Sequence, residues 1–236
     1  MAILLDYSQV SIANLMQQDE TDVSIDLFRH MVLRSIKYYR TRFIGEYGEV
    51  IICCDSTNYW RKKVFPQYKI NRKRTKQYQT RDWDLIFTCL NQVRDELKES
   101  FPYIVLQVDT TEADDIIAII CQMEQEDNII VSGDKDFLQL QKHDGVNQYS
   151  PNRRDMITVD NPEQFKKLHI MRGDSGDGVP NFLSPDNTFA DQIRQKPLSN
   201  KKLNEWSNME PEIFCDIDMM KGYKRNRQLV DLDYIP

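Results

Sequence analysis

The chain has 236 residues, of which 40% are hydrophobic and 29% are charged, and its formal net charge is −6. This composition is typical of a folded globular protein and excludes a mainly disordered chain. No apolar run approaches the ~20 residues that cross a bilayer, and Asp6 interrupts the apolar start too early for a signal peptide. We therefore expect a cytoplasmic protein with no membrane partner.

Four apolar, β-rich runs along the chain predict strands that are buried on both faces of a parallel sheet: 2–5, 50–54, 103–108 and 129–131. Apolar residues at helical spacing between these runs predict helices over 28–39, 86–97 and 111–121. Thr111 and Asp114 resemble an N-cap and its acidic third position. Strand and helix alternate, so we predict an α/β fold with a mostly parallel central sheet flanked by helices.

Asn, Pro, Asp and Gly become frequent after Pro151. We place a change of architecture near residue 165, with an α/β core over 1–165 and a mainly helical region over 166–236. The core is expected to include a basic segment over 56–81. The five cysteines form no C-x-x-C pair, which indicates reduced packing residues rather than disulfides or a zinc site.

The basic segment, residues 56–81, contains no acidic residue. Its cations, interleaved with aromatic residues, are Arg61, Lys62, Lys63, Lys69, Arg72, Lys73, Arg74, Lys76 and Arg81. Such a stretch by itself is most simply a solvated charged loop. It is also the pattern with which a protein binds a polyanion whose bases stack on aromatic rings.

Acidic residues follow each of the four expected strands. Asp6 closes the first, Asp55 follows the second, the cluster 112–115 follows the third, and Asp134 and Asp136 follow the fourth. Any one of these taken alone is most simply a turn former or a helix cap. Because the carboxyl ends of parallel strands meet at one edge of a sheet, the four sets together predict a carboxylate cluster.

Carboxylates that lie within a few ångströms of one another cannot all remain ionised unless a cation offsets their charge. Oxygen ligands without His or Cys select Mg²⁺ or Mn²⁺ over zinc. Mg²⁺ also takes phosphate oxygens as ligands, so the cluster indicates metal-assisted phosphoryl chemistry. Combined with the basic aromatic segment, it predicts that the phosphate belongs to a nucleic acid.

Six short motifs carry a family resemblance. They are L-L-D-Y-S at 4–8, I-I-C-C-D at 51–55, Y-K-I-N-R at 68–72, T-E-A-D-D-I-I-A at 111–118, S-G-D-K-D-F at 132–137 and G-D-S-G-D-G at 173–178. In their order and separations they resemble the 5′ nuclease family of flap endonucleases and 5′→3′ exonucleases. The resemblance implies a PIN-like core, a basic arch or bridge segment, and a helix–three-turn–helix element that binds duplex DNA.

The resemblance also implies roles for individual residues. The expected direct or water-mediated ligands of two Mg²⁺ ions, with Mn²⁺ as a substitute, are Asp6, Asp55, Glu112, Asp114, Asp115, Asp134, Asp136, Asp174 and Asp177. The expected catalytic residues are Asp6, Asp55, Asp134, Lys69 and Arg72, the two cations facing the scissile phosphate. The expected nucleic-acid contacts are Arg61, Lys62, Lys63, Tyr68, Lys69, Arg72, Lys73, Arg74 and Lys76. For Tyr68, stacking on a base and packing are equally open.

The function that the resemblance implies is a Mg²⁺-dependent, structure-selective 5′ nuclease that acts in DNA replication. It would hydrolyse DNA and RNA–DNA duplexes, with ribonuclease H activity, and remove RNA primers and 5′ flaps. Its expected partners are DNA with a 5′ flap or 5′ end, RNA–DNA hybrids, and replication proteins such as a sliding clamp or a single-strand-binding protein. We expect a monomer, located in the host cytoplasm if the source is a virus.

Three other interpretations are open. A PIN-type single-strand ribonuclease predicts a shorter chain with fewer acids and without the motif at 173–178. A catalytically silent nucleic-acid-binding module predicts gaps in the carboxylate set. A small-molecule phosphatase would use Asp134 and Asp136 as an acidic nucleophile motif, but it leaves the basic segment without a purpose.

The sequence departs from the family pattern in two places. After D-G-V-P-N at 177–181 it continues with F-L-S-P at 182–185, without the second glycine pair of its relatives, so we expect a reshaped duplex-binding turn. Relatives generally continue with further helical sequence beyond the point equivalent to 232–236. We expect either a short natural form or a C-terminal truncation.

Overall fold

The computed structural model describes residues 1–16, 24–72, 81–123 and 126–236. It divides into two compact units, and each is described by itself. One holds residues 1–59 and 80–159, and the other holds residues 60–79 and 160–236, apart from the positions that are not described. Of the basic segment, the described residues 60–72 therefore group with the C-terminal region, whereas the sequence analysis placed the whole segment 56–81 in the α/β core.

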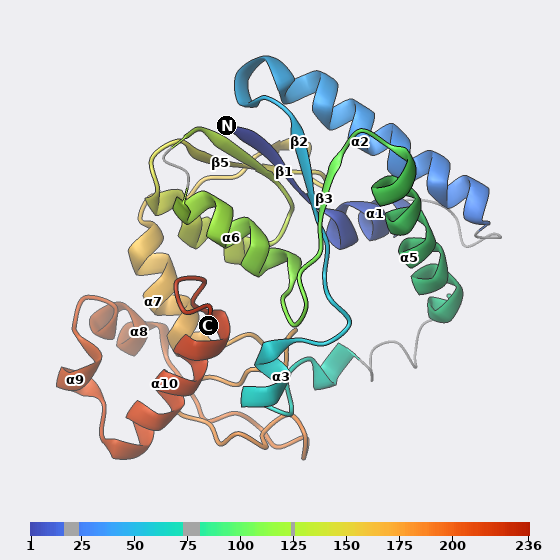
Figure 1. The fold of residues 1–236 in the computed structure, drawn as a ribbon. Coiled ribbons are helices and arrows are strands. Elements are labelled where there is room, and N and C mark those ends of the chain that lie inside the picture. Colours follow the sequence, from blue (N-terminus) through green and yellow to red (C-terminus); the bar gives the residue numbers. More distant parts are fainter. Residues whose placement is uncertain (17–23, 73–80, 124–125) are drawn as a thin grey trace. The chain divides into compact units, whose positions relative to one another are not determined.

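The first unit is built on a six-stranded sheet in the order β3-β2-β1-β4-β5-β6 (Figure 1). The strands are β1 (Ala2–Asp6), β2 (Val50–Cys53), β3 (Ile104–Leu106), β4 (Asn128–Val131), β5 (Val146–Ser150) and β6 (Asp155–Met156). The first five are parallel, and β6 runs antiparallel to β5. This arrangement confirms the predicted fold class and all four predicted strands.

Helices cover both faces of the sheet (Figure 1). On one face lie α1 (Tyr7–Met16), α2 (Ile25–Tyr47) and α5 (Trp83–Ser100), and on the other lies α6 (Ala113–Met123). Successive side chains of a strand point to opposite faces, so Ile3 and Leu5 of β1 pack in the core beneath α2 and α5, while Leu4 and Asp6 point to the α6 face. Every residue of β1 is buried, as expected for a central parallel strand.

Local signals in the sequence set the ends of the long helices. The Ser24 hydroxyl accepts a hydrogen bond from the Leu27 N–H at the start of α2, and the Asp82 carboxylate accepts one from the Leu85 N–H at the start of α5. A 3-10 helix, η1 (Lys135–Lys142), follows β4 and begins at the Asp134 cap. Helix α1 and strands β5 and β6 are elements that the apolar pattern did not predict.

The second unit contains α3 (Trp60–Val64), α7 (Pro162–Arg172), α8 (Asn200–Trp206), α9 (Pro211–Phe214) and α10 (Ile217–Val230). An aromatic cluster of Phe182, Trp206, Phe214 and Tyr223 joins the last three helices to the loop before them. The buried side-chain amide of Asn226 donates to the carbonyl oxygens of Ile170 and Pro180, which ties α10 to the end of α7.

Two smaller expectations concern cysteines and membranes. All five cysteines are free thiols, four of them buried, as the packing interpretation predicts. None of the described helices has the length and apolar content that a bilayer-spanning segment requires.

Candidate functional site

Three carboxylates of the first unit lie at the carboxyl edge of its sheet. Asp6 is the last residue of β1, Asp55 follows β2 by two residues, and Asp134 follows β4 by three. The parallel register pairs Asp6 with Cys53 and Leu5 with Val131, so the three strands end at the same level. The sheet therefore brings together acids that are far apart in the sequence.

Asp6 is the most buried of these three acids, with 6% of its surface exposed. Its oxygens accept hydrogen bonds from the Gln9 N–H at 3.1 Å and the Ser132 hydroxyl at 3.0 Å. Burial, and then the negative charges of Asp55 and Asp134, raise the pKa of Asp6 to about 7. Burial and the neighbouring negative charges therefore both disfavour the ionised form of Asp6.

The loop after β4 is held by two uncharged side chains. The Ser132 hydroxyl accepts from the Asp134 N–H at 3.2 Å, and the Gln148 amide on β5 donates to the carbonyl oxygens of Ser132 and Asp134 at 2.9 and 2.6 Å. The Asp134 carboxylate accepts from the Asp136 N–H at 3.0 Å, as the cap of η1. This network fixes the backbone that carries both acids.

The acids near the start of α6 differ in their surroundings. Asp55 accepts from the Ala113 N–H at 3.0 Å, so its charge lies at the positive end of the helix. Asp115 is fully buried and accepts from the Glu112 N–H at 3.0 Å. The predicted cap at Thr111 and Asp114 is therefore wrong by one residue. The carboxylate that accepts the hydrogen bond at the N-terminus of α6 belongs to Asp115, not to Asp114. Glu112 is also buried, and Asp114 is partly exposed.

In the second unit, Asp174 and Asp177 shape the loop after α7. Asp174 accepts from the N–H groups of Gly176 and Asp177 at 2.8 and 3.2 Å, and its backbone forms a bridge with Val179. Gly173 adopts a φ of 69°, and a Cβ there would meet the Pro180 carbonyl oxygen at 2.4 Å. The turn therefore requires glycine at this position.

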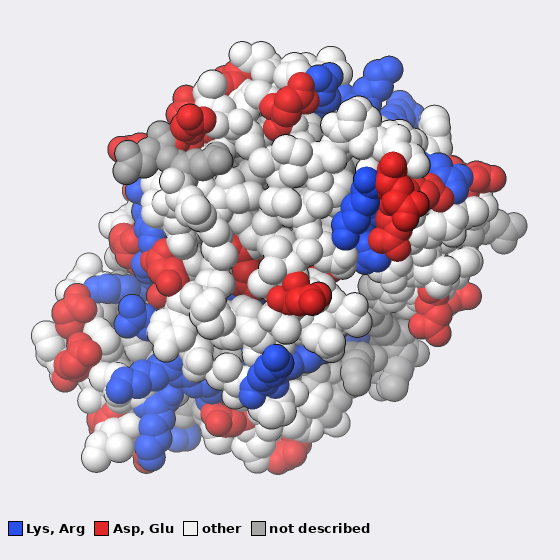
Figure 2. All heavy atoms as spheres, in the orientation of Figure 1, with Lys and Arg blue, Asp and Glu red and all other residues white. Residues whose placement is uncertain are grey.

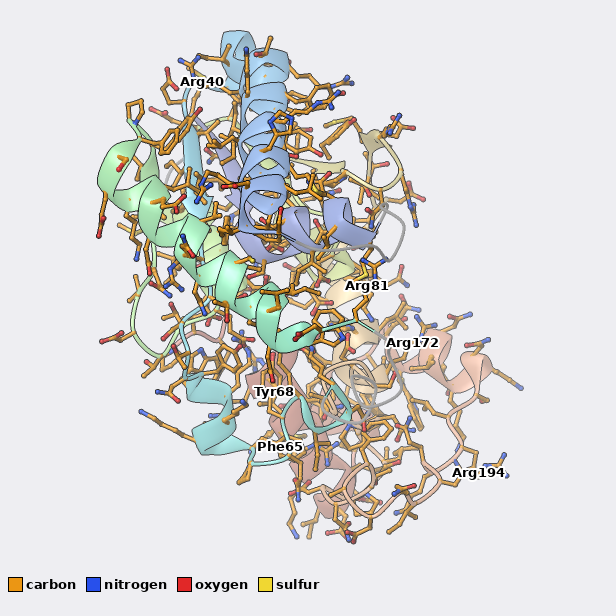
Figure 3. All side chains as sticks on the ribbon, turned by 90° about the vertical axis from the view of Figure 1, so that its right-hand side faces the viewer. Arg40, Phe65, Tyr68, Arg81, Arg172 and Arg194 are labelled. Atoms are coloured by element: carbon orange, nitrogen blue, oxygen red, sulfur yellow. The ribbon has the colours of Figure 1, made fainter. Side chains whose placement is uncertain are left out.

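Asp177 connects this loop to the Y-K-I-N-R motif within the second unit. Its carboxylate accepts from the Tyr68 hydroxyl at 2.9 Å and from Arg72 at 2.6 Å, and its carbonyl oxygen accepts from the Lys69 N–H at 2.6 Å. Burial acts to raise the pKa of Asp177, but the charges of Lys69 and Arg72 outweigh it and hold the pKa below its usual value. The side chains of Tyr68 and Phe65 both come from the segment after α3 (Figure 3).

The other predicted nucleic-acid contacts lie in different environments. Tyr68 is buried against Asp177. Arg61 is 2% exposed and donates to the Leu229 carbonyl oxygen at 2.8 Å, so its guanidinium joins α3 to α10. Lys62 and Lys63 are exposed on α3. Lys73, Arg74 and Lys76 lie outside the described residues.

The sequence did not identify two residues that position the acids through hydrogen bonds. These residues are Ser132 and Gln148. Ser132 stands directly after a predicted strand and two residues before a predicted ligand, a position that could have identified it. Gln148 offers no such signal, because a polar residue in the unpredicted strand β5 resembles a surface residue. Only the structure reveals that Gln148 is fully buried and that its amide donates to the loop that carries Asp134.

The acids described above for the first unit supply carboxylate oxygens as ligands, and Asp6, Glu112 and Asp115 among them are buried. This donor set suits a hard divalent cation such as Mg²⁺ or Mn²⁺ and is unlike the His and Cys sets of structural zinc sites. A site of this kind can bind phosphate oxygens through the cation and promote their hydrolysis.

Residues 7–169 match the family model described as 5′-3′ exonuclease, N-terminal resolvase-like domain. Among characterised proteins, the chain is 28% identical over 249 residues to ribonuclease H of Enterobacteria phage T4, a match that spans 99% of this chain and 81% of that protein. It is 29% identical over 161 residues to DNA polymerase I of Streptococcus pneumoniae, covering 58% of this chain but 17% of the polymerase.

Solved structures show the same fold at low identity. The T5 D15 protein co-crystallised with metal ions superposes with a TM-score of 0.71 at 18% identity, over 98% of this chain and 89% of that chain. The T5 5′-exonuclease with bound zinc gives a TM-score of 0.70 at 19% identity, over 98% and 90% of the two chains.

Proposed function

Because the chain belongs to the 5′-3′ exonuclease family, we propose that it is a metal-dependent, structure-selective 5′ nuclease that cleaves DNA and RNA–DNA hybrids. The name of the phage T4 relative, ribonuclease H, supports the hybrid as a substrate. Removal of RNA primers and 5′ flaps in DNA replication is the task we propose. A sliding clamp or single-strand-binding protein as partner, the monomeric state and the cytoplasmic location remain proposals from the family resemblance.

The observation that carries this proposal is the environment of Asp6. Burial, and then the charges of Asp55 and Asp134, raise the pKa of Asp6 to about 7, so an ionised carboxylate at this position is costly for the folded protein. A divalent cation among these carboxylates would remove the cost. The residues present therefore fit the metal that the family uses, and we propose Mg²⁺, with Mn²⁺ as a substitute.

The residues of the first unit that we propose as direct or water-mediated ligands are Asp6, Asp55, Glu112, Asp114, Asp115, Asp134 and Asp136. When bound, divalent ions supply an activated water and shield the charge on the phosphate. Ser132 and Gln148 keep the Asp134 loop in place, so that ligand positions do not have to form during substrate binding.

In the second unit, we propose that Lys69 and Arg72 stabilise negative charge that develops on the scissile phosphate. The bonds from Tyr68 and Arg72 to the Asp177 carboxylate support a positioning role for Asp177. Asp174 and Asp177 as additional metal ligands, and Lys62 and Lys63 as contacts to the DNA backbone, are proposed from the family resemblance.

The test is digestion of 5′-labelled flap, nicked and RNA–DNA hybrid substrates with and without Mg²⁺. We expect cleavage only with the metal, and we expect Asp134→Asn to abolish cleavage while binding persists, because a ligand charge is lost and repulsion of phosphate falls. The matched control is Asp144→Asn, since Asp144 is exposed. Its cleavage rate should equal that of the wild type.

The same experiment separates the alternatives. Binding of all three substrates without cleavage in Mg²⁺ or Mn²⁺ would indicate a silent binding module. Cleavage of single-stranded RNA in preference to 5′-ended duplexes would indicate a PIN-type ribonuclease. Wild-type turnover by Asp134→Asn would show that the carboxylate cluster is not required for cleavage.

A further inference from the structure

A pocket of about 410 Å³ opens on the first unit, apart from the acids that hold the proposed metal. It is formed by α1, α2 and the segment from the end of β5 to the β6 turn. The lining residues that matter here are Arg34, Ser35, Tyr38, Tyr39, Tyr149 and Arg154. Its volume is within the ~300–1,000 Å³ typical of small-molecule sites.

The pocket has an aromatic wall. Tyr38 and Tyr39 meet edge to face with ring centroids 5.1 Å apart, and Tyr39 meets Tyr149 in the same way at 6.0 Å. Tyr39 and Tyr149 are buried, whereas Tyr38 is 48% exposed. Burial is the largest cause that raises the pKa of Tyr39 to about 12, so its hydroxyl stays protonated. Tyr38 is thus an accessible ring that packs against the buried Tyr39 ring.

The charged residues that line the pocket are all cations. Arg34 on α2 and Arg154 in the turn before β6 both line it, and no described lining residue is acidic. Arg42 adds a third positive charge nearby, 5.0 Å above the Tyr149 ring. In a chain of net charge −6 whose surface mixes both signs (Figure 2), a cationic pocket of this size favours an anionic ligand.

The Arg154 backbone is held in a conformation that a non-glycine residue seldom adopts. Its φ is 55°, and its N–H donates to the Ser150 carbonyl oxygen at 2.8 Å, closing the turn after β5. This turn keeps Arg154 on the side of the strand end that lines the pocket.

The pocket is connected to the carboxylate cluster through one strand end. The carbonyl oxygen of Tyr149 accepts from the Ser132 N–H at 3.1 Å, and the Ser132 hydroxyl donates to Asp6. The pocket wall and the proposed metal ligands therefore share the backbone at the carboxyl ends of β4 and β5. A ligand in the pocket would lie on the same sheet edge as the acids.

We propose that this pocket binds one unpaired nucleotide of the nucleic-acid substrate, with its base on the Tyr38 ring and its phosphate on Arg34 and Arg154. The proposal rests on the proposed nuclease function for the identity of the polyanion. An accessible ring beside two guanidinium groups matches a nucleotide in both shape and charge.

The test measures binding of fluorescein-labelled (dT)₆ to the full chain in EDTA. Arg34→Gln and Arg154→Gln should each weaken binding about tenfold, because each removes a charged hydrogen-bond donor. Tyr38→Ala should weaken it by a similar factor through lost stacking. Matched controls are Lys37→Gln and Arg153→Gln, exposed cations next to the pocket residues in sequence but outside its lining. Both should bind as the wild type does.

A blunt 12-base-pair duplex serves as the second ligand. Its affinity should change less than twofold in the pocket variants, since it has no unpaired nucleotide to insert. Equal losses of affinity for the duplex and for (dT)₆, or equal losses in the pocket variants and the controls, would overturn the proposal. Arg34 and Arg154 would then contribute only to the general positive charge of the surface.

Cleavage of a 5′ flap in Mg²⁺ by the wild type separates this proposal from the nuclease function. If cleavage occurs and the pocket variants bind (dT)₆ as the controls do, the pocket proposal is wrong and the nuclease function stands. If Arg34 and Arg154 support (dT)₆ binding but no substrate is cleaved, the pocket stands as a nucleotide site and the nuclease function is wrong.

Discussion

The Ser132 hydroxyl connects Asp6 and Asp134, two acids that belong to neighbouring strand ends. It donates to Asp6 at 3.0 Å and accepts from the Asp134 N–H at 3.2 Å. A methyl group in its place would leave Asp6 buried with one donor fewer and would release the N–H that fixes the Asp134 loop. The hydroxyl therefore stabilises the fold and positions two proposed ligands.

We predict that Ser132→Ala lowers the free energy of unfolding by ~1–2 kcal/mol, because a buried hydrogen-bonded group is left without its partner. Mg²⁺ affinity should fall by ~10-fold, the lower end of the effect of losing a group that orients a ligand. Urea denaturation in EDTA measures the first quantity, and Mg²⁺ titration by calorimetry measures the second.

Ser11→Ala is the matched control for this change. Ser11 is also buried, and its hydroxyl has no hydrogen-bond partner among the described residues. Its loss should leave both the unfolding free energy and the Mg²⁺ affinity nearly unchanged. If the two alanine variants behave alike, the Ser132 hydroxyl does not hold the acids.

The strand-end rule predicted the positions of the acids because it depends only on apolar runs and the residue that follows each run. It missed β5 because Asn147 and Gln148 interrupt the apolar pattern there. Gln148 is tolerated in a buried strand because its amide donates to two loop carbonyls, a compensation that the sequence does not display.

The grouping of residues 60–72 with the C-terminal region could not be predicted either. The contacts that create it join residues more than one hundred positions apart, such as Tyr68 with Asp177 and Arg61 with Leu229. Periodicity and composition report on neighbours in sequence. Polar contacts between residues far apart in the sequence produce no periodic pattern that such an analysis could detect.

Two helical glycines should respond in opposite directions to the same substitution. Gly45 in α2 is exposed, and a Cβ there would meet nothing within 4 Å. Gly222 in α10 is buried, and a Cβ there would overlap the Phe182 carbonyl oxygen. Gly45→Ala should raise the free energy of unfolding by up to ~1 kcal/mol through helix propensity.

Gly222→Ala should instead lower the free energy of unfolding by ~1–3 kcal/mol, because α10 must move away from the loop that carries Phe182. Paired urea denaturation curves of the two variants give both values. Stabilisation by Gly222→Ala would show that the close approach of α10 to this loop is not required.

The ion pair between α2 and α5 gives the protein a defined acid sensitivity. Arg29 contacts Glu96 through two bonds of 2.6 and 2.8 Å, and these bonds lower the pKa of Glu96 from 4.5 to about 2. Since the folded-state pKa is depressed, the stabilisation is complete above pH ~4.5 and is lost as the pH falls toward 2.

We predict that Glu96→Gln lowers the free energy of unfolding by up to ~1 kcal/mol at pH 6, the value expected of a partly exposed pair. The difference from the wild type should shrink at pH 3. Denaturation curves at both pH values measure it, with Glu99→Gln, an exposed carboxyl of the same helix α5, as the control. A difference that is equal at pH 6 and pH 3 would contradict the assigned role of the carboxylate charge.

Variants of Lys69 and Lys63 should distinguish a cation that acts on the scissile phosphate from a cation that only contacts the DNA backbone. Lys69 has a φ of 61°, and its N–H is held by the Asp177 carbonyl oxygen at 2.6 Å, so its position is set by the G-D-S-G-D-G loop. Lys63 is exposed on α3. Both are changed to Gln, which removes the charge and keeps most of the side-chain length.

With Lys69→Gln we predict a single-turnover cleavage rate ~10²-fold lower at saturating enzyme, because a cation that stabilises the transition state is lost. Its affinity for a 5′-flap substrate at fixed salt should change by only ~1 kcal/mol. With Lys63→Gln the saturated rate should equal that of the wild type, and the slope of log affinity against log salt should fall by ~1. Wild-type single-turnover cleavage by Lys69→Gln, together with a salt slope reduced as in Lys63→Gln, would place Lys69 on the general cationic surface instead of at the scissile phosphate.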